Sequence, residues 1–143
     1  VVLKSDSLRK KFSDYPASGP ITRTKAALDF TSNPMARKYK TRISKAYKGP
    51  VAFARHYIIA LWGCGTSCAE GVMADVRDGK VYPLPHSPKG EYEFVDYSAQ
   101  PGSTLLITDF FGVPGVPTQK NYWNWNEKTK RFELISAEQG DAE

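Results

Sequence analysis

Two cysteines separated by three residues offer the clearest chemistry in this chain of 143 residues. Cys64 and Cys68 are its only cysteines, and they directly follow its most apolar run. Close spacing, an even count and flanking glycines favour a disulfide across a turn, which would add roughly 2 kcal/mol of stability through loop entropy. A redox pair is less favoured because the Cys-x-x-Cys spacing is absent. A zinc site with His56 and His86 is also less favoured, since structural zinc ligands usually come as two compact pairs.

A disulfide would place the protein in an oxidising compartment, because cytosolic proteins rarely keep such bonds. The chain begins with Val1 instead of methionine, and we expect that an export signal was removed before this residue. The longest apolar stretch, Tyr57 to Trp62, is far shorter than the ~20 residues that cross a bilayer. We therefore expect a periplasmic or secreted protein without a membrane span.

Acid–base chemistry has weaker support in the sequence. His56 could act with a cysteine as a nucleophilic pair, but a disulfide would remove the nucleophile. Carboxylates that could serve as acid or base are Asp75, Asp78, Glu91, Glu93, Asp96 and Asp109. The motifs of serine hydrolases, zinc peptidases, phosphate-binding loops and calcium loops are absent from the sequence. We therefore favour a binding role over an enzymatic one, and expect no catalytic residue, no cofactor and no metal.

A basic amphipathic helix is predicted over residues 34–47. Asn33-Pro34 forms a capping start and Gly49-Pro50 an end, while Met35, Tyr39 and Ile43 recur at helical spacing and are expected to face the protein interior. The other face carries Arg37, Lys38, Lys40, Arg42 and Lys45. Such a face is usually just solvated, but it could bind phosphates of nucleic acid or an anionic envelope polymer.

Aromatic side chains gather near the end of the chain. Trp123 and Trp125 share one face of a predicted strand, which indicates either core or a recognition groove. The preceding Gly/Pro-rich loop, residues 112–117, is stiffened by two prolines and carries Val113 and Val116. We take the candidate partner-binding residues to be Phe111, Val113, Val116, Trp123, Trp125, Arg37 and Lys38.

The elements that must position these residues are mostly strands. A short helix is expected around residues 5–12, followed by an extended connector over residues 17–32. Strand signals cover residues 53–62, 71–76, 81–84, 92–95, 104–111, 121–126 and 131–136. Hairpin turns are predicted at Arg77-Asp78-Gly79-Lys80 and at Glu127-Lys128-Thr129-Lys130. Because the connections are short, the strands should form an antiparallel meander.

These elements predict an α+β fold in which N-terminal helices pack on a mainly antiparallel β-meander sheet. The length suits a single domain, residues 1–143, with a basic helical part (1–50), a sheet (51–137) and a frayed tail (138–143). Charge divides along the same boundary: residues 1–50 carry 12 basic and 3 acidic side chains, and the remainder carries 8 and 12. Such a chain can dock on itself or attract an anionic partner.

Three segments carry a resemblance to a known group. They are Gly49 to Tyr57, Trp62 to Cys68 with its Trp-Gly-Cys-Gly-Thr-Ser-Cys motif, and Asp75 to Tyr82. In these segments the chain resembles small, uncharacterised, lipoprotein-like proteins exported by Gram-negative bacteria. The resemblance implies an envelope location and a disulfide, and it carries over no catalytic residues to this chain.

We therefore expect an exported bacterial binding protein whose partner is another envelope protein. By analogy of size and location, it would be an inhibitor or immunity-type protein that acts on an envelope or cell-wall enzyme. One alternative is a small envelope hydrolase that uses His56 and nearby carboxylates. The other is a nucleic-acid binder that uses the basic helix 34–47, and export makes nucleic acid the least favoured partner.

Overall fold

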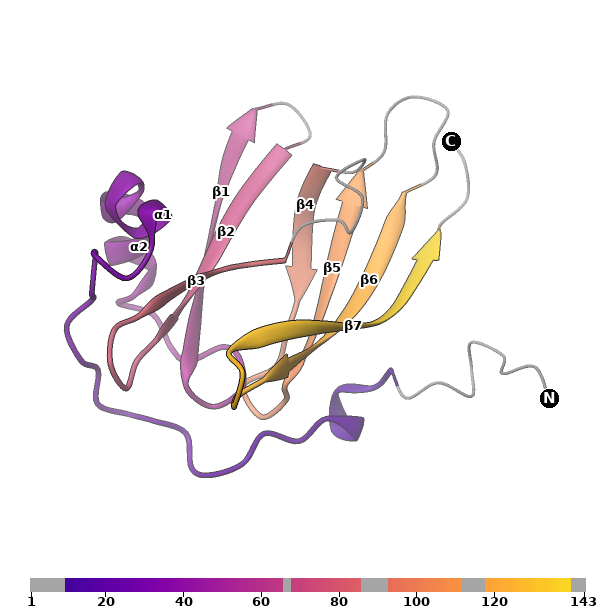
Figure 1. The fold of residues 1–143 in the computed structure, drawn as a ribbon, viewed down its shortest axis with the longest axis horizontal. Coiled ribbons are helices and arrows are strands. Elements are labelled where there is room, and N and C mark those ends of the chain that lie inside the picture. Colours follow the sequence, from indigo (N-terminus) through magenta and orange to yellow (C-terminus); the bar gives the residue numbers. More distant parts are fainter. Residues whose placement is uncertain (1–9, 66–67, 86–92, 112–117, 140–143) are drawn as a thin grey trace.

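The computed structural model describes residues 10–65, 68–85, 93–111 and 118–139, and these residues are mostly β. The helices are η2 (Phe12–Asp14, a 3-10 helix), α1 (Pro34–Lys38) and α2 (Lys40–Ala46). The strands are β1 (Tyr57–Gly65), β2 (Cys68–Asp75), β3 (Val81–Pro83), β4 (Glu93–Ser98), β5 (Leu105–Phe111), β6 (Gln119–Asn126) and β7 (Arg131–Gln139). The class is α+β in this coarse sense, with two short α-helices beside antiparallel sheets (Figure 1).

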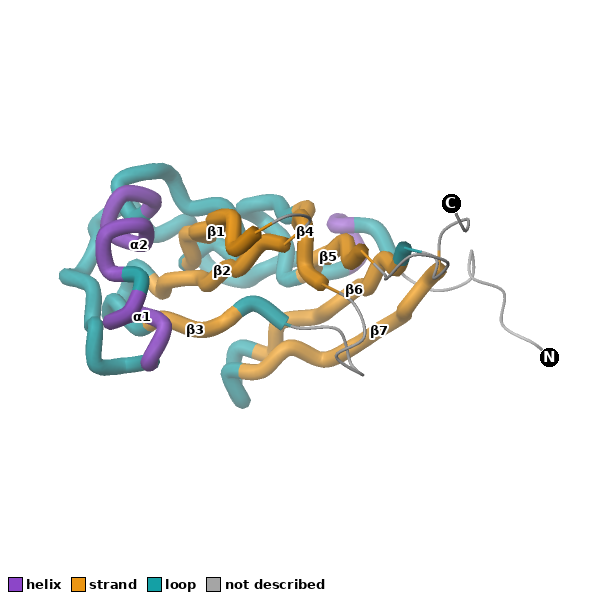
Figure 2. Tube along the Cα trace, turned by 90° about the horizontal axis from the view of Figure 1, so that it is seen from above, coloured by secondary structure: helices purple, strands orange, loops and turns teal. Residues whose placement is uncertain are grey.

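The strands form two sheets instead of the single meander that the sequence predicts. Their orders are β1-β2-β3 and β4-β5-β6-β7, and all neighbours within them are antiparallel. The first sheet ends at β3, which is only three residues long and closes on Pro83, a residue without an N–H to donate. β2 lies beside β4, while β3 and β7 lie on the same side of the molecule (Figure 2).

The main core lies between the two sheets. It is formed by Ala17, Phe53, Ala54, Tyr57, Ile59, Met73, Leu84, Leu106, Phe110, Trp123 and Trp125. Alternation along β1 and β2 also buries their opposite face, so that Ala60, Trp62 and Val72 join a second cluster with Ala36 and Ile43 of the helices. Both faces of this hairpin are therefore covered, and its strands read as nearly continuous apolar runs.

The predicted helix 34–47 is interrupted at Tyr39, whose φ of −112° separates α1 from α2. Its predicted start is confirmed, because the Asn33 side chain accepts a hydrogen bond from the backbone N–H of Met35 at 2.8 Å. Ile43 is buried and Tyr39 is half-buried, while the five cations of the outer face are exposed as predicted. Instead of a helical layer, the structure has two short helices beside β1 and β2. None of the helices in the described ranges has the length and apolarity needed to cross a membrane.

Several strand boundaries differ from the prediction, among them the start of β1 and the end of β7. The chain from Phe53 to Tyr57 forms a turn, with positive φ at Ala54 and Arg55, so β1 begins at Tyr57 instead of Phe53. β7 continues to Gln139, beyond the predicted sheet end at residue 137. Glu138, assigned to a frayed tail by the sequence, accepts a hydrogen bond from Lys10 Nζ. A long-range ion pair thus holds a residue whose local sequence suggested disorder.

The N-terminal connector (residues 17–32) runs along the ends of both sheets (Figure 1). Its backbone N–H groups bond to distant carbonyls: Ala17 to Gly102 at 2.9 Å, Ala26 to Val76 at 2.8 Å, and Asp29 to Gly79 at 2.9 Å. Of the helix predicted around residues 5–12, residues up to 9 lie outside the described part, and the chain beyond Lys11 forms only the single turn η2. The connector is extended, as predicted, and it links the two sheets.

Candidate binding groove

A groove of about 410 Å³ lies between β3 and the β6–β7 hairpin. It is lined by Tyr82, Pro83, Leu84, Pro85, Trp123, Trp125, Lys130, Arg131 and Phe132. Both flanking elements include a terminal strand, because β3 ends one sheet and β7 ends the other. The groove therefore lies where terminal strands of the two sheets, which do not hydrogen-bond to each other, come close together.

Aromatic rings form the floor of this groove. The Trp125 ring packs against Phe132 at 4.8 Å and against Tyr82 at 5.5 Å between centroids. Trp123 is 7% exposed and Trp125 is 3% exposed, so their rings are a backing surface and not protruding anchors. Their indole N–H groups point to internal acceptors, since Trp123 Nε1 donates to Thr108 Oγ1 and Trp125 Nε1 donates to Glu127 Oε2, both at 2.8 Å. The floor thus offers a rigid apolar surface.

Positive charge lies at the rim. Lys130 Nζ donates to Glu127 Oε1 at 2.5 Å, so its charge is partly compensated. Arg131 is exposed, and within the described ranges no carboxylate lies within 4.0 Å of it. An uncompensated guanidinium beside an aromatic surface favours a ligand that carries a carboxylate.

A polar network supports the floor from below. The Tyr57 hydroxyl is its centre: it donates to Glu127 Oε2 at 2.8 Å and accepts from Trp125 Nε1 and Arg77 Nη2, each at 3.1 Å. Arg77 in turn holds the buried Asp75 with two hydrogen bonds, of 2.9 Å and 2.8 Å, and also pairs with Glu127. The network joins the first sheet to the β6–β7 turn and fixes the Trp125 ring.

Burial and the charges in this network shift the pKa values of Glu127 and Tyr57. Burial alone would raise the pKa of Glu127, but hydrogen bonds from Lys130, Arg77, Tyr57 and Trp125 outweigh burial and lower this pKa to about 2. Burial and the neighbouring Glu127 raise the pKa of the Tyr57 hydroxyl. At neutral pH the network therefore contains an ionised Glu127 and a protonated Tyr57, which matches their hydrogen bonds.

The partner-binding residues predicted from the sequence fall into separate places. Trp123 and Trp125 lie together in the groove floor, within the core and the groove at once. Phe111 is the last residue of β5, and its side chain lies outside the described part, as do Val113 and Val116 of the loop 112–117. The remaining groove residues were missed, because β3 and β7 are distant in sequence and only the fold brings them together.

Arg37 and Lys38 lie on α1, away from the tryptophans. Both line a shallow surface depression of about 420 Å³ with Phe30, Thr31, Asn33 and Pro34. No acidic residue occurs in the sequence between Asp29 and Glu70. The positive charge of α1 and α2 therefore has no local compensation along the chain.

His56 lies beside the polar network but bonds elsewhere. Its Nδ1 is 2.8 Å from Thr22 Oγ1. Burial, together with the nearby Arg77 charge, lowers the pKa of His56, so the imidazole is neutral at pH 7. The carboxylates of Asp75 and Glu127 are engaged by Arg77 and Lys130. His86 lies outside the described residues.

Cys64 lies near the end of β1, and Cys68 is the first residue of β2. Gly63 pairs with Ala69 and Gly65 pairs with Cys68, so Cys64 occupies an irregularity in the strand opposite Cys68. Both cysteine side chains lie outside the described part, and the disulfide stays a prediction. The likeness of this motif to exported proteins also stays a prediction. Comparison of the chain with models of protein families, with curated proteins and with solved structures found no match.

Proposed function

We propose that this chain is a binding protein of the bacterial envelope that holds an extended segment of a partner protein in the groove between β3 and β7. The observation that carries this proposal is the groove itself, with an aromatic floor and, at its rim, Arg131, which has no carboxylate within 4.0 Å in the described part of the chain. Aromatic and arginine side chains are those that most often dominate the energy of protein interfaces.

The flanking strands support an extended partner. A terminal strand has backbone N–H and C=O groups on its outer side that can pair with another chain. β7 is nine residues long, and within the described ranges only β6 pairs with it. A segment added along β7 would place alternate side chains over the aromatic floor, which is the usual geometry of strand addition. A carboxylate on this segment would meet Arg131.

The envelope part of the proposal is supported by the cysteine spacing and by the resemblance to exported proteins. A protein that occupies a partner's segment in this way can act as an inhibitor or immunity protein for a cell-wall enzyme. Intact mass with and without reductant tests the disulfide between Cys64 and Cys68. Two thiols that alkylate freely in the native protein would remove the main support for export.

Capture from a periplasmic extract, followed by mass spectrometry, identifies the partner. Titration calorimetry with the purified partner then compares the wild type with Tyr82→Ala and Arg131→Glu in the groove. We expect each groove variant to bind at least about tenfold more weakly, a loss of about 1.4 kcal/mol. Lys45→Glu, an exposed charge change on α2, is the control and should bind like the wild type.

The captured enzyme should also lose activity when wild-type protein is added, and Arg131→Glu should inhibit it less. If Tyr82→Ala and Arg131→Glu keep wild-type affinity and melting temperature, the groove is not the binding surface. If Lys45→Glu weakens binding as much as Arg131→Glu, the interaction depends on net charge and not on the groove.

Binding of an anionic polymer is a second candidate function, favoured by the exposed cations of α1 and α2. Release of counterions would make such binding fall steeply as salt rises. Affinity for duplex DNA measured over a range of salt concentrations tests this candidate, with Arg37→Glu and Arg42→Glu expected to weaken it. Affinity at physiological salt no better than that of an unrelated basic protein would rule it out.

A further inference from the structure

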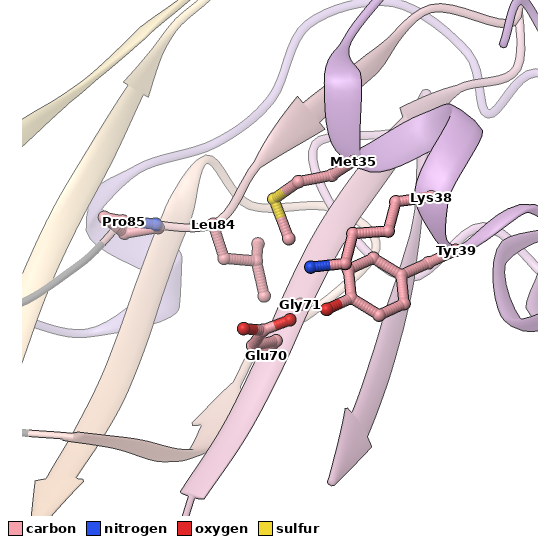
Figure 3. Close-up of a pocket in the computed structure, with 7 residues that line it drawn as sticks. All are labelled: Met35, Lys38, Tyr39, Glu70, Gly71, Leu84 and Pro85. Carbon is pink, nitrogen blue, oxygen red and sulfur yellow. The ribbon is translucent and has the colours of Figure 1, made fainter. Parts of the chain in front are cut away.

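A small cavity between α1 and β2 has side chains of opposite charge on its two sides (Figure 3). Its volume is about 180 Å³, and its lining is Met35, Lys38, Tyr39, Glu70, Gly71, Leu84 and Pro85. In Figure 3 the Lys38 amine and the Glu70 carboxylate both lie toward the cavity, with the Tyr39 hydroxyl beside them. The cavity is thus built from a helix, a strand and the segment after β3.

Contacts with aromatic rings hold both charged groups. Glu70 Oε2 accepts a hydrogen bond of 3.4 Å from the indole Nε1 of the buried Trp62. The Tyr39 ring packs on Trp62 at 4.5 Å between centroids, and Lys38 Nζ lies 5.3 Å from the centre of the Tyr39 ring. Trp62 therefore supports both sides of the cavity, through its hydrogen bond to Glu70 and its packing against Tyr39.

Lys38 and Glu70 do not form an ion pair. Within the described part, ion pairs with an N···O distance of 4.0 Å or less involve other residues, among them Arg77 with Asp75 and Lys130 with Glu127. Among the described residues, neither the Lys38 ammonium group nor the Glu70 carboxylate has an opposite charge within 4.0 Å. A ligand that supplies a carboxylate to Lys38 and an ammonium group to Glu70 would compensate both.

The remaining walls are apolar and close. Met35, Leu84 and Pro85 form them, and Gly71 lies beneath Leu84. A Cβ atom at Gly71 would lie 2.6 Å from Leu84 Cδ1, so the glycine lets the end of the Leu84 side chain lie directly on β2. The volume is well below the roughly 300–1,000 Å³ of sites that take drug-sized molecules, so the ligand must be small.

We propose that this cavity binds a free α-amino acid with an apolar side chain. The Lys38 ammonium group binds the α-carboxylate, the Glu70 carboxylate binds the α-ammonium group, and the side chain of the ligand packs on Met35, Leu84 and Pro85. An anion alone would be repelled by Glu70, and a cation alone by Lys38, so only a ligand with both charges gains from both contacts. Leu84 and Pro85 also line the aromatic groove, but the charged groups Lys38 and Glu70 do not, and this proposal does not rest on the groove's function.

Titration of the isotope-labelled protein with leucine, followed by NMR, tests the proposal. We expect saturable shifts at the backbone amides of Lys38, Tyr39, Glu70 and Gly71. Two analogues separate the charges: 3-methylbutylamine lacks the carboxylate, and 4-methylpentanoate lacks the ammonium group. We expect each to bind at least tenfold more weakly than leucine. Equal binding of leucine and either analogue, or no saturable shift with millimolar leucine, would overturn the proposal.

Variants provide the second arm of the test. Lys38→Met and Glu70→Gln keep the length of the side chain and remove its charge, and each should weaken leucine binding at least tenfold. Lys40→Met is the control, because Lys40 lies over Phe30 and outside the cavity lining. Unchanged leucine affinity in both cavity variants, with melting temperatures equal to the wild type, would contradict the assigned contacts. The analogue series on the wild type decides the question if a variant fails to fold.

Discussion

Asn121 places a polar amide in the interior of the protein. It is fully buried on β6, and neither Oδ1 nor Nδ2 has a hydrogen-bond partner in the part of the chain that the structure describes. Its neighbours across the sheet are Thr108 and Ala137. A buried amide without partners costs about 1–3 kcal/mol, so this position should be one where a polar group reduces stability.

We therefore expect Asn121→Val to raise the free energy of unfolding by about 1 kcal/mol, since valine removes both polar atoms and favours strands. For a domain of this size the melting temperature should rise by about 2–4 °C. Asn124→Val is the matched control on the same strand: Asn124 bonds to Thr104 and Glu133, and its loss should lower stability. A lower melting temperature for Asn121→Val would show that the amide is satisfied, for instance by an internal water.

At the scale of elements, the turn between β2 and β3 fixes the connector. Gly79 has a φ of +78°, and a Cβ atom there would lie 1.9 Å from the Ala27 carbonyl oxygen. Gly19 has a similar φ of +83°, but a Cβ atom there would meet nothing within 4 Å. The two glycines therefore separate the cost of the backbone conformation from the cost of lost packing.

We expect Gly19→Ala to lower the free energy of unfolding by about 1 kcal/mol, the usual cost of a left-handed conformation. Gly79→Ala should cost about 3 kcal/mol or more, because the connector must also move away and lose the hydrogen bond from Asp29 to the Gly79 carbonyl. Urea denaturation of the two variants measures both values. Equal losses would mean that the connector is only loosely held on the turn.

Local sequence predicts most elements of this fold but not how the sheets are divided. Asn33-Pro34 starts a helix and Asp78-Gly79 forms a hairpin turn because short-range capping and positive φ decide both. The local sequence indicates the break at Tyr39 and the late start of β1 less clearly. In the second case, Ala54 and Arg55 adopt positive φ although neither is glycine. Division into two sheets depends on the packing of residues far apart in sequence, which no local pattern reports.

For the candidate groove, too, local sequence does not show which distant residues come together. Trp123 and Trp125 were indicated by their aromatic character and shared face. Tyr82 and Arg131 were not, because they line one groove only once the fold has brought β3 and β7 to the same side of the molecule. Arg77 and Glu127, which belong to the network below the groove floor, were not predicted for a different reason. Both lie in or beside hairpin turns, where charged side chains are common and usually solvated.

At the scale of the whole molecule, one ion-pair network links the two sheets. Arg77 follows β2, Glu127 follows β6, and the two side chains pair beside Tyr57. The pKa of Glu127 is lowered to about 2 from its ordinary 4.5. A carboxylate whose pKa is lower in the folded state stabilises that state above its ordinary pKa, and this contribution is lost as the pH falls toward the folded-state pKa.

We therefore expect the wild type to exceed Glu127→Gln in melting temperature by a constant amount above about pH 5, and this difference to shrink as the pH falls toward about 2. Glu133→Gln removes a carboxylate whose partners among the described residues are the neutral amides of Asn124 and Asn126, and it corrects for the change in net charge. Carboxyl NMR of Glu127 should give a titration midpoint near 2. A midpoint near 4.5 would show that the network does not form in solution.

The contacts of the N-terminal connector bear on the order in which the chain folds. It is made first, yet its bonding partners are Gly102, Arg55, Val76 and Gly79, and Lys10 pairs with Glu138 near the other end. Contacts so distant in sequence form late, because the intervening chain must be ordered before they can stabilise anything. We therefore expect the connector to dock after the strands have assembled, across two sheets that the shared core and the Arg77–Glu127 pair already hold together.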